Sequence, residues 1–355
     1  SIIIKETTNN DLVDVDIDVE EAPTGQFNFG VAFDSYRGPT FISGLKENNI
    51  AGDGRNIDLS VNTSENNREL SFGLLEPYIF NQNLDFIYDI SYSETNRTDS
   101  ASYELDEFNS SIGLRYQLAD KLKHSITLEY QLKDYTITNS STVSSIIEKQ
   151  SGSNSDIILN NSLVYDDLDA LIRPTKGNHV AYFNKLSPAT NNENGYVKNI
   201  VTYKKYFKQK SNIFSIQSRI GNIFSLQNEE IPTDDKFSLG GRWLRGFDNY
   251  GVGPRNSRTS YTGGNNLVVT KLDFQRPILS ESDNPVDLNL FIDAGTVFGN
   301  KVTPTSSGSS LRSSLGYGIK FYSPIGPVGF SWAYPITDED YDIKRMFNFS
   351  IGNLN

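Results

Sequence analysis

One glycine-rich segment, residues 237–254, combines side chains suited to pairing charge inside a protein. It reads Phe-Ser-Leu-Gly-Gly-Arg-Trp-Leu-Arg-Gly-Phe and continues to a Gly-Val-Gly-Pro sequence. Exposed aromatic residues such as Trp243 and Phe247 reduce solubility, whereas a loop that folds inward buries them. Its glycines let the backbone turn tightly, and Arg245 can find buried carboxylates. The segment therefore predicts a loop inserted into a large barrel.

Residues that usually carry catalysis or hold metals are scarce. The chain has no cysteine and only two histidines, His124 and His179. That leaves no Cys/His metal site and no Ser-His-Asp triad that can be placed. A catalytic His179 is a weak alternative because it lacks convergent partners. Gly240 and Gly241 lack the strand–turn–helix context of a phosphate-binding loop. We expect no enzyme activity, no metal and no cofactor.

The composition narrows the class of protein. The 355 residues suffice for two average domains or one large all-β barrel. With 44 Asp and Glu against 32 Lys and Arg, the acidic balance argues against nucleic acid as the main partner. No apolar run reaches the roughly 18 residues of a transmembrane helix. The negative mean hydropathy is uninformative for a β-barrel, in which only alternate residues face lipid.

Polar and apolar residues alternate almost throughout the chain, which predicts β-strands. In residues 286–298, one face carries Leu288, Leu290 and Ile292, and the other carries Asp287, Asn289, Phe291 and Asp293. Residues 268–275, 311–322 and 347–352 alternate in the same way. A soluble sandwich would show the same period, so alternation alone does not decide the class.

Three further observations favour a membrane barrel. The apolar faces are rich in aromatic residues, since 40 of 355 residues are Phe or Tyr. The polar faces carry charges that a wet lumen tolerates and a dry core does not. Short connections alternate with long polar ones, as in outer-membrane barrels. The short ones include residues 118–121 and 324–327, and the long ones are 96–106, 139–155, 229–264 and 301–310. We predict an all-β, 16-stranded antiparallel transmembrane β-barrel over residues 25–355.

The first 24 residues differ from the rest. Residues 11–21 alternate apolar side chains with four aspartates and two glutamates, and residues 22–25 then break the pattern. A lipid-facing strand would not tolerate these acids. We expect residues 1–24 to be the last strand of a small soluble domain and a hinge, with an extra edge strand of the barrel as the alternative. No signal peptide is recognisable, and we expect an N-terminal part to be missing.

Five segments of the chain resemble the BamA family of outer-membrane protein assembly factors. Residues 15–30 are similar to the exit from the family's last polypeptide-transport-associated (POTRA) domain, and residues 172–177 to its mid-barrel Pro-Thr-x-Gly turn. The tip of residues 243–247 resembles the family's Val-Arg-Gly-Phe/Tyr motif in the sixth extracellular loop. The other two segments are residues 49–54 with 76–78, and the C-terminal block that starts at residues 291–295. The loop tip together with Phe-x-Asp-x-Gly is a specific signal.

The resemblance implies a device inside the barrel. The loop tip, Trp243-Leu-Arg-Gly-Phe247, would fold down the lumen so that Arg245 meets carboxylates on two strands. Asp273 and Asp293 lie on the polar faces of their expected strands and are the candidate partners. An arginine fork between carboxylates is strong and directional. A solvated Arg245 on a surface loop is the alternative. The tip residues are Trp243, Leu244, Arg245, Gly246 and Phe247.

The functional centre would be a weak seam, or lateral gate, between the first and last strands. The first strand, expected over residues 26–33, and the last, over residues 347–353, supply Phe27, Phe29, Val31, Phe33, Phe347, Phe349, Ile351 and Gly352. A weak seam can open and pair with a client strand, whereas an ordinary closed seam is the alternative. The family's last strand usually ends on an aromatic residue, but this chain ends at Asn355. Either the seam closes differently or the barrel's own targeting signal is relaxed.

The resemblance implies a non-enzymatic insertase that folds client β-barrels into the outer membrane of a Gram-negative bacterium. Its preceding domains would lie in the periplasm. The expected partners are outer-membrane lipids and lipopolysaccharide, unfolded client outer-membrane proteins and accessory assembly lipoproteins. The alternative is an export pore of the same superfamily, as in two-partner secretion. A barrel lipase or protease is disfavoured because the histidines do not cluster.

Overall fold

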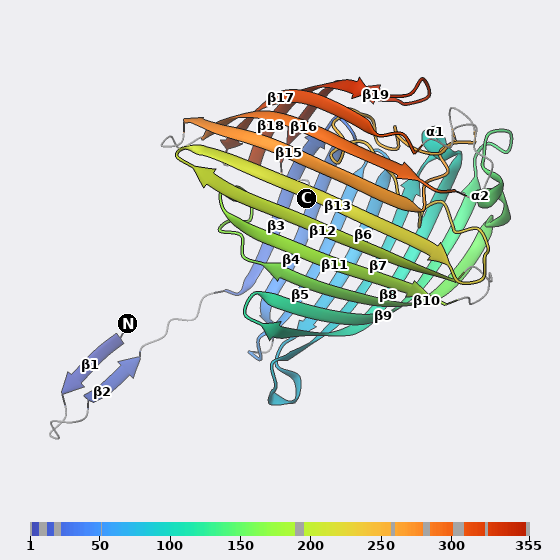
Figure 1. Ribbon diagram of the computed structural model, residues 1–355. Helices are drawn as coiled ribbons and strands as arrows, with labels where there is room; N and C mark the ends of the chain where they lie inside the picture. Colours follow the sequence, from blue (N-terminus) through green and yellow to red (C-terminus); the bar gives the residue numbers. More distant parts are fainter. Residues whose placement is uncertain are drawn as a thin grey trace.

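The barrel is closed and contains sixteen antiparallel strands. The computed structural model describes residues 2–6, 13–17, 23–50, 52–188, 195–256, 260–279, 285–300, 309–323 and 326–352. Strands that follow one another in the chain pair as neighbours, and the last strand returns to the first (Figure 1). The predicted fold class is confirmed.

The barrel strands are β3 (Gly25–Asp34), β4 (Gly38–Ile50), β5 (Arg55–Ser64), β6 (Asn67–Glu76), β7 (Leu84–Asn96), β8 (Tyr103–Ala119), β9 (Leu122–Ile137), β10 (Gly152–Asp166), β11 (Gly177–Ser187), β12 (Tyr196–Gln209), β13 (Asn212–Ser225), β15 (Asn266–Leu279), β16 (Val286–Phe298), β17 (Arg312–Ser323), β18 (Gly326–Thr337) and β20 (Phe347–Ile351). Outside the barrel lie β1 (Ile2–Glu6), β2 (Val13–Ile17), β14 (Gly246–Phe247), β19 (Lys344–Arg345), the helices α1 (Thr98–Ala101) and α2 (Ser145–Lys149), and the 3-10 turn η1 (Ile79–Asn81). None of the helices in the described ranges is long and apolar enough to cross a membrane.

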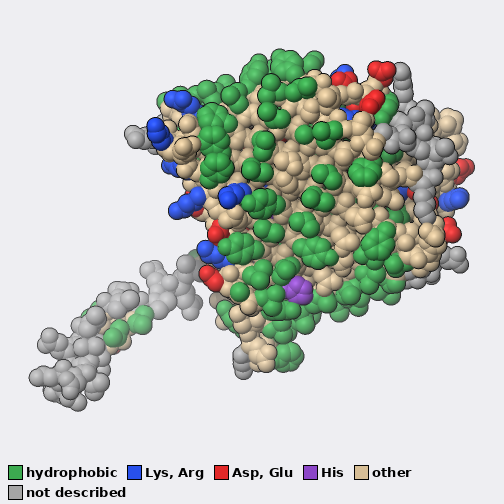
Figure 2. Space-filling model, in the orientation of Figure 1, with side chains coloured by type: hydrophobic (Ala, Val, Ile, Leu, Met, Phe, Trp, Pro, Cys, Tyr) green, Lys and Arg blue, Asp and Glu red, His purple; other side chains and the backbone are tan. Residues whose placement is uncertain are grey.

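The side chains on the two faces of each strand have different surroundings, as the alternation predicts. On β16, Leu288, Leu290 and Ile292 point outward with 40–56% of their surface exposed. On the lumen face of the same strand, Asp287 and Asp293 are fully buried. Figure 2 shows apolar side chains spread over the visible barrel wall, with charged side chains gathered near its two ends. This distribution is that of a barrel whose wall contacts hydrocarbon.

Connections differ between the two ends of the barrel. At the end where β3 begins, the turns at 120–121 and 210–211 have two residues each and place Lys121 and Lys210 at φ of 63° and 56°. Such positive φ values are typical of tight hairpin turns. The opposite end carries the long connections, including residues 138–151 and 226–265. The expected loop 96–106 is shorter than predicted, because β7 and β8 extend to Asn96 and from Tyr103 and only α1 lies between them.

The N-terminal residues form a unit separate from the barrel sheet. β1 pairs with β2 in an antiparallel register that places Ile2 opposite Ile17. The strand expected over residues 11–21 is therefore described only over Val13–Ile17, and most of the expected hinge lies outside the described residues. β3 begins at Gly25, where the barrel was expected to start. The assignment of residues 1–24 to the end of a POTRA domain stays a prediction.

We predict that substitution by arginine destabilises the barrel much more at one residue in the middle of β8 than at the adjacent residue. Ile112 is 49% exposed on the outer face, whereas Ser111 lies on the lumen face opposite Glu129 of β9. Ile112→Arg should destabilise the barrel in lipid vesicles by about 2–4 kcal/mol, because it places a charge in hydrocarbon. Ser111→Arg, the matched control at the same depth, should cost little. Equal shifts in the urea unfolding midpoints would contradict the assignment of the two faces.

Candidate functional site

The connection from β13 to β15, called loop 6 below (residues 226–265), packs inside the barrel. Its apolar residues Leu239, Leu244, Phe247 and Val252 are almost fully buried. They form one cluster with lumen-facing residues of the wall, among them Ile223, Leu267, Val269 and Val297. The loop thus fills part of the lumen with its own small core.

Glycines of the wall and loop make this packing possible. A side chain on Gly221 of β13 would lie 2.4 Å from the Phe237 ring. A side chain on Gly316 of β17 would lie 2.2 Å from the Phe291 ring. Gly240 has a φ of +129°, and a Cβ there would lie 1.9 Å from the carbonyl oxygen of Asp248. Only glycine fits these positions without a shift of backbone or ring.

Arg245 at the loop tip binds two lumen carboxylates. Its Nε and Nη2 donate to the two oxygens of Asp293 at 2.7 and 2.6 Å, and Nη1 donates to Asp273 at 2.8 Å. The Arg245 backbone N–H also donates to Asp293, at 3.0 Å. The guanidinium carbon lies 3.5 Å from the centroid of the Phe291 ring. A planar five-donor group is thus held by two strands and an aromatic face.

The electrostatic environment keeps Arg245 charged. Burial would lower its pKa, but the charges and hydrogen bonds of Asp273 and Asp293 raise the pKa above its usual value. Only 13% of the Arg245 side chain is exposed, and Asp293 is fully buried. The interaction is therefore a buried ion pair, and removal of one partner leaves the charge of the other buried and uncompensated.

The other residues of the tip also lie inside. Leu244 and Phe247 are fully buried, and Gly246 is buried with a φ of +95°. Trp243 packs partly buried against the loop core, with the Arg219 guanidinium 5.2 Å from the centroid of its ring. The structure therefore brings together the tip and the carboxylates that sequence reasoning placed on different strands.

The first and last strands meet over a short distance. β20 pairs with β3 in only two register positions, Ser350 with Asp34 and Ile351 with Phe33. β3 pairs with β4 over its whole length of ten residues. Beyond the strand pairs, the Ser35 N–H donates to the Phe349 carbonyl at 3.0 Å, and the Phe349 N–H donates to Ser35 Oγ at 2.9 Å. The contact is thus confined to one end of the barrel.

Gly25–Val31 of β3 has no partner strand on the seam side among the described residues. Here Phe27, Phe29 and Val31 are 72%, 69% and 53% exposed. Gly352, with a φ of +84°, directly follows β20 and is the last described residue, and residues 353–355, including the non-aromatic Asn355, lie outside the described part of the chain. The described last strand, Phe347–Ile351, is shorter than expected.

The expected seam residues divide into three groups. Phe33, Phe349, Ile351 and Gly352 lie where the strands meet, and the Phe33 and Phe349 ring centroids are 5.6 Å apart. Phe27, Phe29 and Val31 lie along the unpaired stretch of β3. Phe347 lies instead against Trp332 of β18, with ring centroids 5.1 Å apart.

Loop 6 also contacts the segments that flank the seam, which sequence reasoning missed. β14 of the loop pairs with β19, which lies just before β20. Arg345 of β19 donates to Asp248 at 2.8 Å, and Asn249 Nδ2 donates to the Tyr36 carbonyl in the β3–β4 turn at 3.3 Å. The sequence offers no signal for these contacts, because the partners lie 97 and 213 residues apart.

The histidines do not form a shared site. His124 Nδ1 lies 2.8 Å from the Tyr116 hydroxyl, and His179 Nδ1 lies 2.8 Å from Asp166. Within the ranges that the structure describes, no cluster of three His, Cys, Asp or Glu residues could hold a metal ion. The site is one of charge pairing and strand pairing.

Known proteins similar to this chain include outer-membrane protein assembly factors and a sorting assembly machinery subunit. A BamA outer-membrane protein assembly factor from Neorickettsia risticii is 24% identical over 353 residues, which is 95% of this chain and 46% of the relative. The sorting assembly machinery 50 kDa subunit of Saccharomyces cerevisiae is 29% identical over 57% of this chain and 44% of its own length. The chain thus spans about half the length of these relatives.

A solved structure shares the fold over the whole chain. BamA from Haemophilus ducreyi lacking POTRA domains 1–3 superposes with a TM-score of 0.84 and 22% identity, covering 99% of this chain and 74% of the other. The Omp85 superfamily domain model matches residues 49–354. The chain therefore belongs to the Omp85 superfamily, with a BamA-type β-barrel of the bacterial outer membrane.

Proposed function

We propose that this chain is a non-enzymatic insertase that folds client β-barrel proteins into the outer membrane through its seam. The observation that carries the proposal is the two-residue pairing between β20 and β3. The stretch Gly25–Val31 of β3 offers backbone donors and acceptors that no described strand occupies. An exposed strand edge is a template for another strand.

The bilayer makes such a template useful. Hydrocarbon supplies no hydrogen-bond partner, so a strand that enters the membrane alone leaves each of its backbone groups unsatisfied. Pairing with β3 satisfies those groups as the strand inserts. The exposed Phe27, Phe29 and Val31 add an apolar face along which a client strand can lie. The device lowers the cost of insertion without making or breaking a bond.

Loop 6 would brace the wall on the last-strand side of this edge. Arg245 ties the loop to β15 and β16, and Asp248 ties it to Arg345 just before β20. The last-strand side of the seam therefore has internal support. We infer that this support keeps β20 in place while β3 pairs with a client.

The partners follow from this role. The names of the relatives, assembly factor and sorting assembly machinery, support handling of membrane-protein clients. We propose that unfolded outer-membrane proteins are the clients, and that lipids, lipopolysaccharide and accessory lipoproteins are contacts. Residues 1–24 would end a periplasmic POTRA domain that delivers clients to β3.

Export of a soluble partner through the lumen is the alternative function. The buried core of loop 6 and its Arg245 anchor occupy the lumen that an exported chain would use. This observation favours the seam as the working surface.

We predict that a covalent lock across the seam abolishes insertion. Phe33 and Ile351 are directly opposite each other, and the chain has no cysteine of its own. Phe33→Cys with Ile351→Cys, joined by oxidation or by a short thiol-reactive crosslinker, should stop client folding in liposomes. Where the two cysteines are joined by a disulfide, adding a reductant should restore client folding. Val31→Cys with Phe41→Cys is the matched control, because it joins β3 to β4 and leaves the seam free. Full insertion by the locked seam would refute the gating role.

We also predict that Arg245→Ala releases the loop and slows insertion. Loss of one partner of a buried ion pair destabilises by about 3–5 kcal/mol, because the other charge stays buried. Amide exchange of residues 237–254 should rise, and client folding should fall about tenfold or more. The control is Arg242→Ala, an exposed arginine of the same loop. Unchanged exchange and unchanged folding in the Arg245 variant would count against the brace.

A further inference from the structure

Loop 6 has a second ionic contact with the wall, far from Arg245. Residues 230–237 enter the lumen through a turn in which the Asp235 and Lys236 N–H groups donate to the Pro232 carbonyl at 3.2 and 3.3 Å. This turn directs Asp234 and Asp235 toward strands β9, β11 and β12. Both carboxylates are more than 90% buried there.

Asp235 is the centre of the contact. Lys133 of β9 and Lys185 of β11 lie 3.0 and 3.2 Å from its two oxygens. The Tyr196 hydroxyl of β12 donates to it at 2.7 Å, and Lys198 Nζ of β12 donates to its backbone carbonyl at 2.6 Å. Three strands of the wall thus bind one loop residue.

Asp234 extends the same contact. It accepts from Lys133 at 2.5 Å and from the Tyr135 hydroxyl, both on β9. Burial would raise the pKa of Asp235, but the three lysines and Tyr196 hold it well below its usual range. The loop carboxylate is therefore charged inside the lumen, where its partners are cationic.

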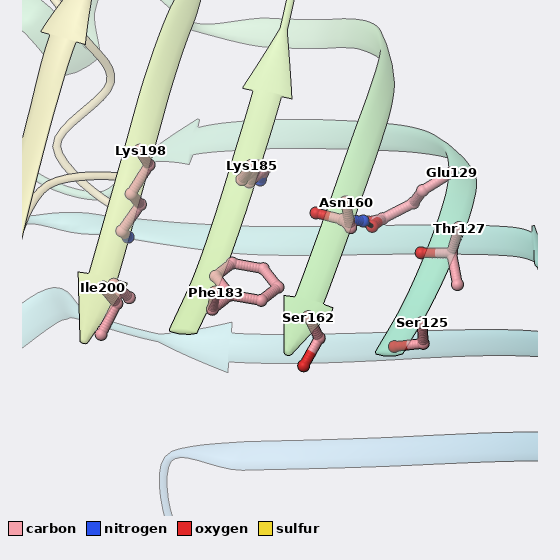
Figure 3. A pocket seen from close by; sticks show the side chains of 9 residues that line it. All are labelled: Ser125, Thr127, Glu129, Asn160, Ser162, Phe183, Lys185, Lys198 and Ile200. Atoms are coloured by element: carbon pink, nitrogen blue, oxygen red, sulfur yellow. Dashed lines mark hydrogen bonds between the residues drawn. The ribbon is translucent and has the colours of Figure 1, made fainter. Parts of the chain in front are cut away.

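The next layer of the lumen contains a polar cavity. Figure 3 shows Lys185 and Lys198 on neighbouring strands beside it, with Glu129 and Asn160 on the strands beyond. The cavity has a volume of about 410 Å³. Asn160 Nδ2 donates to Glu129 at 2.6 Å, so this carboxylate already has a partner. The loop supplies the carboxylates that form ion pairs with Lys133 and Lys185.

The two ionic contacts have opposite polarity. At one, the loop brings anions to cationic strands β9, β11 and β12, and at the other it brings Arg245 to the anionic pair on β15 and β16. Only nine residues of chain lie between Asp235 and Arg245. A loop placed in the wrong orientation would set Asp235 against Asp273 and Asp293, which like-charge repulsion disfavours. Together the contacts specify one position of the loop.

We propose that Asp235, assisted by Asp234, is a positioning residue that anchors loop 6 independently of Arg245 and sets the depth of the tip. The contribution of this anchor to client insertion rests on the function proposed above, whereas the anchor itself does not. Loss of the anchor shifts Trp243 and Arg245 relative to their contacts. If Asp235 only stabilised the barrel, its substitution would leave the surroundings of the loop tip unchanged in the molecules that remain folded.

Trp243 provides a client-free measurement of the tip. The chain has two tryptophans, so Trp332→Phe leaves Trp243 as the single tryptophan of the full chain. In this background, Asp235→Asn should raise the acrylamide quenching constant of Trp243 about twofold or more in lipid vesicles. Asp235→Glu, which keeps the charge, should restore most of the protection. Glu229→Gln is the matched control, because Glu229 is an exposed carboxylate on the same limb of the loop.

Tyr196→Phe provides a milder variant if Asp235→Asn does not fold. It removes one hydroxyl donor to Asp235 and should raise quenching by a smaller factor. The gel mobility of unheated samples reports whether each barrel is folded. Unchanged quenching in a folded Asp235→Asn variant overturns the anchor. Raised quenching with normal client insertion supports the anchor, and it contradicts a role for the position of loop 6 in the proposed function.

Discussion

Backbone hydrogen bonding in hydrocarbon is the constraint on which this structure depends. A membrane strand must pair on both edges, because lipid offers its N–H and C=O groups no partner. Among the residues that the structure describes, fifteen of the sixteen strand interfaces meet this demand over most of a strand length, and the interface of β3 with β20 does so at two positions. The same chain thus has a stable wall and one edge with unused pairing capacity. A client strand in the membrane has the complementary need.

Charge pairs in the lumen hold the loop that supports this wall. The Arg245 fork binds β15 and β16, and Asp235 binds β9, β11 and β12. Together the two interactions join separate parts of the wall, β9 to β12 and β15 with β16, to a single loop, so the loop resists changes in barrel shape. The contacts from Asp248 to Arg345 and from Asn249 to Tyr36 extend the network to both flanks of the seam. Loop position and seam geometry are therefore physically connected.

Alternation and loop chemistry predicted the barrel, and the same reasoning placed Asp273 and Asp293 on the lumen face. Arg245 was recognisable because its aromatic and glycine neighbours make sense only in a buried loop. Asp234 and Asp235 were not recognised, since an acidic pair in a long polar loop resembles a solvated segment and its lysine partners lie 37 to 102 residues away. The length of the seam could not be predicted either. The length depends on the strand register and on where β20 ends. Phe347 alternates with polar residues just as Phe349 and Ile351 do, so the sequence does not show which of them meet β3.

The most direct test is residue-resolved amide exchange along β3 in lipid nanodiscs, with and without a synthetic client strand of alternating apolar and polar residues. Between Gly25 and Val31, alternate amides point toward β4 and toward the seam. Seam-facing amides should exchange fast in the free protein and become protected when the client strand is added, while amides facing β4 stay protected throughout. Equal protection of both sets in the free protein, or no change on adding the client, would contradict the proposed role of the seam.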